Sequence, residues 1–196
     1  MAISLHTHDR GEHEALRRLI LSAMFIAIGV ILPFFTGQIQ QIGKMILPMH
    51  LPVMLCGLIC GWQYGGVVGL ILPFLRSMMF GMPLMYPNAV SMSIELAVYG
   101  LTIGLIYGLF WKQNVFTVYL ALIPSMILGR AAWGGTQVLI LGLSDQSFTW
   151  KLFFVGAVLQ ALPGIIIQLL LIPAIMSMLH HTGILPYKGD THDPNT

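Results

Sequence analysis

Long apolar runs separated by short polar breaks constrain this chain more than any other feature. A helix needs about 20 consecutive apolar residues to cross the hydrocarbon core of a bilayer. Hydrophobic residues make up 57% of the 196 residues and charged residues only 8%, against about 25% charged in a typical soluble domain. A soluble protein with so few charges could not cover its own surface, so the pattern predicts an all-α integral membrane protein.

The apolar runs divide the chain into six expected transmembrane helices. They cover residues 19–35, 45–61, 64–80, 88–111, 116–143 and 151–179. The second run opens with Pro48 and Pro52, which indicates an irregular start to its helix. We therefore expect a polar segment at 1–18, a six-helix transmembrane domain at 19–180 and a polar tail at 181–196.

The basic residues indicate how the chain is oriented in the membrane. Cytoplasmic loops carry an excess of Lys and Arg. With both termini in the cytoplasm, the inner side carries Arg10, Arg17, Arg18, Lys112 and Lys188, and the outer side carries Lys44 and Lys151. The rule therefore favours cytoplasmic termini and a multi-pass protein of the cell membrane.

Several function classes are excluded or made improbable by what the sequence contains. A net charge of +2 without a basic tract gives no reason to expect nucleic acid as a partner. Cys56 and Cys60 have only His50 nearby, so we interpret them as buried thiols, with no metal or other cofactor. Because G-x-S-x-G, H-E-x-x-H, P-loop and paired-carboxylate patterns are lacking, we predict that the chain is not an enzyme.

Three charged residues lie within the expected spans, where each costs at least about 2.5 kcal/mol at the bilayer centre. Arg76, Glu95 and Arg130 all fall in the outer half of their helices, so they are candidates for one shared cavity. Two positive groups and one negative group do not cancel, which favours a bound solute with an acidic group. Two alternatives stay open: Glu95 pairs with one arginine for structural reasons, or Arg76 extends to the outer interface.

Other polar residues at the same level are candidates to line that pocket. They are Tyr86, Asn88 and Ser91 at the start of the fourth span, Trp133 and Gln137 beyond Arg130, and His50. Gln168 is a weaker candidate, because a buried Gln often only bonds a neighbouring helix. The connection between the first two spans suits a mobile lid over an outward-facing site, with Gly37, Gln40, Gln41, Gly43 and Lys44.

Small residues mark places where helices approach closely, within this chain or in a partner. Ala23 and Ala27 lie four apart in the first span, with Ser22 and Gly29 nearby. A second group surrounds the expected tight turn between the second and third spans, and consists of Gly61, Gly65, Gly66 and Gly69.

Several of these motifs together resemble a known family. The motifs are the Ala23-xxx-Ala27 pair, Leu47-Pro48-Met49-His50-Leu51-Pro52-Val53, Cys56-Gly57-Leu58-Ile59-Cys60-Gly61 with Gly65, Pro73-xx-Arg76-Ser77, and Phe80-Gly81-Met82-Pro83. Over residues 17–179 the chain resembles the substrate-binding S components of energy-coupling factor (ECF) vitamin importers, a family of six-helix membrane proteins.

The resemblance implies a function that spacing alone does not give. It implies capture of a vitamin-like molecule at the outer side of a prokaryotic cell membrane, under the loop between the first two helices. It also implies association with a transmembrane coupling subunit and two cytoplasmic ATPases, with Ala23 and Ala27 contacting the coupling subunit. The pantothenate-type members are the most similar. Pyridoxine or hydroxymethylpyrimidine, riboflavin and folate stay open as substrates, as does a stand-alone secondary transporter.

Overall fold

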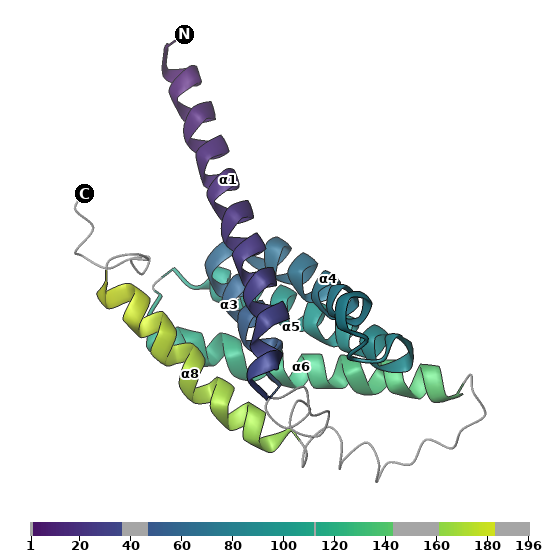
Figure 1. Ribbon diagram of the computed structural model, residues 1–196. Helices are drawn as coiled ribbons and strands as arrows, with labels where there is room; N and C mark the ends of the chain where they lie inside the picture. Colours follow the sequence, from purple (N-terminus) through teal and green to yellow (C-terminus); the bar gives the residue numbers. More distant parts are fainter. Residues whose placement is uncertain (1, 37–46, 112, 143–160, 183–196) are drawn as a thin grey trace.

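The computed structural model describes residues 2–36, 47–111, 113–142 and 161–182. Within these ranges lie six α-helices and no strand (Figure 1). The helices are α1 (Ala2–Ile31), α3 (His50–Cys60), α4 (Trp62–Phe80), α5 (Val90–Leu109), α6 (Val115–Gly142) and α8 (Leu162–His181). Two shorter helical segments flank them, the 3-10 segment η1 (Leu32–Thr36) after α1 and the π-type segment η2 (Met85–Ala89) before α5.

Four stretches among the described residues are long and apolar enough to cross a membrane. They are Glu12–Phe35, Met85–Leu109, Val115–Ile140 and Leu162–His181. The all-α membrane class expected from the sequence is therefore confirmed. Helix α4 has sufficient length but carries Gln63 and Arg76, and these polar side chains lower its hydropathy.

Helix α3 begins later than its apolar run indicated, and the first ten residues of the expected sixth span, 151–160, lie outside the described residues. Helix α3 has 11 residues, about 16 Å at 1.5 Å per residue, against a hydrocarbon core of about 30 Å. It begins at His50 because Leu47 has a positive φ of 53° and a turn follows it. Helix α8 begins at Leu162, with Pro163 in its first turn, where proline is well tolerated.

Glycines bring α3, α4 and α5 into backbone contact. The two helices α3 and α4 are joined by a tight turn at Gly61, whose φ of 101° suits glycine. A Cβ added to Gly100 on α5 would lie 2.1 Å from the carbonyl oxygen of Gly65, and one added to Gly104 would lie 2.5 Å from Trp62. We call Gly57, Gly65, Gly100 and Gly104 the glycine-packed end. The expected close approach at Gly65 is confirmed.

Helix α1 packs on α3 and α4 with only one of its faces, and its N-terminal part projects beyond the other helices (Figure 1). On the inner face, Ser22 accepts a hydrogen bond from the Cys56 thiol at 3.6 Å, and Gly29 lies against Leu72. Ala23 and Ala27 lie on the exposed face. The four small residues of the first span therefore serve two different surfaces.

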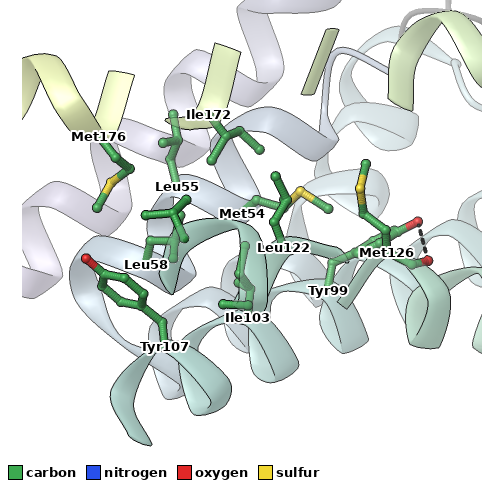
Figure 2. Packing of buried hydrophobic residues seen from close by; sticks show 12 residues of the cluster. Met54, Leu55, Leu58, Tyr99, Ile103, Tyr107, Leu122, Met126, Ile172 and Met176 are labelled. Atoms are coloured by element: carbon green, nitrogen blue, oxygen red, sulfur yellow. Dashed lines mark hydrogen bonds between the residues drawn. The ribbon is translucent and has the colours of Figure 1, made fainter. Parts of the chain in front are cut away.

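A large apolar cluster joins α3, α5, α6 and α8 (Figure 2). Each helix contributes one residue that is important for the site: Met54, Tyr99, Met126 and Ile172. The Tyr99 hydroxyl donates a hydrogen bond of 3.3 Å to the carbonyl oxygen of Met126, which ties α5 to α6 (Figure 2). We call these four residues the apolar floor.

Candidate functional site

Three buried polar residues and one half-buried arginine lie one helical turn from the apolar floor. His50 precedes Met54 by one turn on α3, Glu95 precedes Tyr99 on α5, and Gln168 precedes Ile172 on α8. Arg130 follows Met126 by one turn on α6. Residues four apart share one face of a helix, so each polar residue lies above its partner in the floor. We call His50, Glu95, Arg130 and Gln168 the polar layer.

Glu95 is the centre of the charged part of this layer. Its Oε1 atom lies 3.0 Å from Nη1 of Arg130 and 3.4 Å from Nε2 of His50. The Glu95 and His50 side chains are almost fully buried, and that of Arg130 is 15% exposed. The His50 ring packs edge-on against Tyr99 at 5.2 Å. A carboxylate, a guanidinium and an imidazole thus share one enclosed space.

The contacts within the layer leave several buried donors unused. Arg130 Nε and Nη2, His50 Nδ1 and Gln168 Nε2 have no hydrogen-bond partner within the described ranges. Nε and Nη2 form the side edge of the guanidinium, because Nη1 lies on the opposite side, next to Cδ. This edge presents two parallel N–H groups, the fork that binds a carboxylate or phosphate with two hydrogen bonds. This edge of Arg130 has the geometry with which a guanidinium binds an anionic group.

Arg76 has different surroundings from those expected. Its Nη1 donates a hydrogen bond of 2.7 Å to the carbonyl oxygen of Val30 at the end of α1. The guanidinium carbon lies 5.4 Å from the Phe34 ring and 5.8 Å from the Phe80 ring. Pro33 has no N–H with which to continue the helix, so Arg76 provides a donor where α1 ends.

Arg76 therefore does not join Glu95 and Arg130 in one charged cluster. The charged part of the polar layer contains one carboxylate and one guanidinium, and these pair with each other. Counting two arginines against one glutamate predicted an excess positive charge in this cluster. That excess is not found there, because Arg76 instead lies against a backbone carbonyl and two aromatic rings.

The other candidate residues vary in how they are placed. Trp133 and Gln137 are half-buried and continue the Arg130 face of α6 outward, and Asn88 is half-buried before α5. Tyr86 is 61% exposed, and the buried Ser91 hydroxyl donates to the carbonyl oxygen of Pro87. The expected lid residues Gly37, Gln40, Gln41, Gly43 and Lys44 lie outside the described residues.

Sequence reasoning gave too little weight to Gln168. Its signal was an amide in an otherwise apolar run, and only packing shows that it lies one turn above the same floor as Arg130. No group of three or more His, Cys, Asp or Glu side chains that could hold a metal occurs in the part of the chain that was described.

Comparison with known proteins identifies the family. The family model for the substrate-specific component of ECF transporters matches residues 17–176. The chain belongs to this family. Neither the curated proteins nor the solved structures gave a match. The S component resemblance is thus confirmed: the chain is a substrate-binding subunit and not an enzyme. Such components are multi-pass membrane proteins that bind a small molecule and work with a membrane coupling subunit and ATPases.

Proposed function

We propose that this S component captures an acidic vitamin, pantothenate in the first instance, at the extracellular side of the membrane. One observation carries the proposal. Arg130 uses Nη1 to contact Glu95, while its buried Nε and Nη2 edge has no partner among the described residues. A solute carboxylate would accept both N–H groups of that edge.

Glu95 and His50 fit this arrangement. Glu95 contacts Nη1 of Arg130, on the side of the guanidinium opposite the Nε–Nη2 edge. This contact fixes the orientation of the Nε–Nη2 edge. A solute carboxylate adds a negative charge to a buried pair that is already neutral, and a buried net charge is costly. The His50 ring, 3.4 Å from Glu95 and with an Nδ1 atom that has no partner among the described residues, can donate a hydrogen bond toward that charge.

The proposal extends to transport. The polar layer lies toward the ends of α3, α5, α6 and α8 that we assign to the outer side, with both termini in the cytoplasm. In this topology six helices cross the membrane, and Gly37, Gln40, Gln41, Gly43 and Lys44 belong to the loop that covers the site. Ala23 and Ala27 form the contact with the coupling subunit, which delivers the solute inward together with two ATPases.

The test is direct binding of radiolabelled pantothenate to the purified protein. Arg130→Lys keeps a positive charge opposite Glu95 but loses the fork, so we expect the affinity to fall about 10- to 100-fold. Arg76→Lys is the matched control, because the same change is made at an arginine that holds α1 rather than the solute. We expect its affinity to stay within about twofold of the unmodified protein.

Unchanged affinity in Arg130→Lys would contradict the anion site. A thermal-shift panel of pantothenate, pyridoxine, hydroxymethylpyrimidine, riboflavin and folate tests the choice of vitamin. A solute at 100 times its dissociation constant stabilises the protein by about 2.7 kcal/mol. Concentrative uptake into vesicles by this chain alone would instead favour a secondary transporter.

A further inference from the structure

Gln168 is the member of the polar layer that the anion site does not use. It is 2% exposed on α8, and its Nε2 atom has no hydrogen-bond acceptor among the residues the structure describes. A buried amide without an acceptor is destabilising, so natural proteins rarely keep one without a reason. The position therefore requires an explanation of its own.

A hollow of about 190 Å³ lies beside Gln168. Its walls come from η1, from the turn before α3 and the first turn of α3, and from α8. The lining residues are Leu32, Phe35, Leu47, Pro48, Leu51, Ile167, Gln168 and Leu171. Among the described residues of this lining, Gln168 contributes the only polar side chain. The hollow is thus an apolar space with one hydrogen-bond donor in its wall.

The hollow and the polar layer share α3 and α8, which carry His50 and Gln168. Leu51 in the wall directly follows His50, and Gln168 lies one turn above the same floor as Arg130. Pockets that enclose a whole drug-sized ligand have volumes of about 300–1,000 Å³. The smaller volume of this hollow suits one part of a solute whose other part lies at Arg130.

We propose that Gln168 and this hollow form the part of the solute site that selects for an apolar, oxygen-bearing group. The Gln168 amide donates to a hydroxyl or carbonyl oxygen of the solute, and the Leu and Phe side chains cover its carbon chain. This inference rests on the proposed function, since Arg130 holds the acidic group. The substrate class is a small acid with a branched aliphatic portion, a description that pantothenate meets.

Two variants and one matched control test this inference by pantothenate binding to the purified full-length protein. Gln168→Leu removes the donor at similar volume, and we expect the affinity to fall about tenfold. Leu171→Trp fills the hollow, and we expect an equal or larger loss. Leu170→Trp makes the same change at the neighbouring residue, which is 67% exposed and does not line the hollow. We expect it to bind normally.

Each outcome separates this inference from the function on which it rests. If Gln168→Leu and Leu171→Trp bind pantothenate normally while Arg130→Lys does not, the inference is overturned and the anion site stands. If the unmodified protein does not bind pantothenate, both are overturned. If Leu171→Trp reduces only the amount of lipid that copurifies, as measured by mass spectrometry, the hollow holds an acyl chain and the inference is wrong.

Discussion

Helices α3 and α5 meet in two very different ways along their length. At the glycine-packed end, Gly57 lies so close to α5 that an added Cβ would be 2.7 Å from the carbonyl oxygen of Gly100. Two turns away on α3, His50 contacts α5 through a side chain, with 3.4 Å between its Nε2 and Glu95 Oε1. The same two helices therefore pass from backbone contact to a separation that admits charged side chains.

The comparison indicates where the bundle can adapt and where it cannot. Closely packed backbones have no flexible side chains to rearrange, so a change in the glycine-packed end must move whole helices. The polar layer contains long side chains with unused donors within the described ranges. A solute can be accommodated in the polar layer by reorienting these side chains, while the opposite end keeps α3, α4 and α5 together.

The largest effect is expected at the glycine-packed end. A Cβ at position 100 would lie 2.1 Å from the Gly65 carbonyl oxygen, a backbone atom that cannot turn away. We expect Gly100→Ala to lower the free energy of unfolding by more than about 3 kcal/mol, measured by thermal unfolding in detergent. Gly108→Ala on the same helix meets nothing within 4 Å and is the control. Equal melting temperatures for the two variants would refute the close packing.

A smaller but distinctive effect is expected in the polar layer. Glu95→Leu leaves Arg130 without its counter-charge, and breaking a buried ion pair costs about 3–5 kcal/mol. The exposed 15% of the Arg130 side chain moderates this cost, so we expect about 2–3 kcal/mol. The double variant Glu95→Leu/Arg130→Leu should regain most of the stability without regaining pantothenate binding.

Thermal unfolding and binding, measured on the same preparations, check this second prediction. If the double variant is no more stable than Glu95→Leu alone, the ion pair is not the source of the loss. If the double variant binds pantothenate, binding of the pantothenate carboxylate does not require Arg130.

The smallest effect on the isolated chain is expected outside both regions. Ala27 is exposed on α1, so Ala27→Leu should change the melting temperature by no more than about 1 °C, since surface substitutions are usually within about 0.5 kcal/mol. If this face contacts the coupling subunit, the larger side chain should prevent copurification of that subunit. Met24→Leu, at a neighbouring exposed position, is the control. Normal copurification of Ala27→Leu would exclude this alanine from the interface.

The glycines and the arginines show how far the sequence could be read. The small residues Gly65 and Gly69 indicated close helix contacts, because only small side chains allow them, and the structure has these contacts. The two intramembrane arginines looked alike in the sequence, since each was a charge in an apolar run. Their partners differ because Pro33, in η1 directly after α1, has no N–H to donate at the end of α1, and Arg76 from α4 donates there instead.

The sequence by itself determined the all-α membrane class, the charged residues worth examining and the family resemblance. These follow from local composition and motifs. The length of an apolar run decides whether a helix can cross the membrane, and a charge in such a run is costly, whatever the neighbouring helices are. Tertiary packing alone decided that Glu95 pairs with Arg130 and His50, that Ala23 and Ala27 face outward, and that Gln168 lies one turn above the apolar floor beside a hollow. Each of these depends on which faces of helices distant in the chain pack against one another. A helix that is apolar on nearly all sides does not show in its sequence which face is packed.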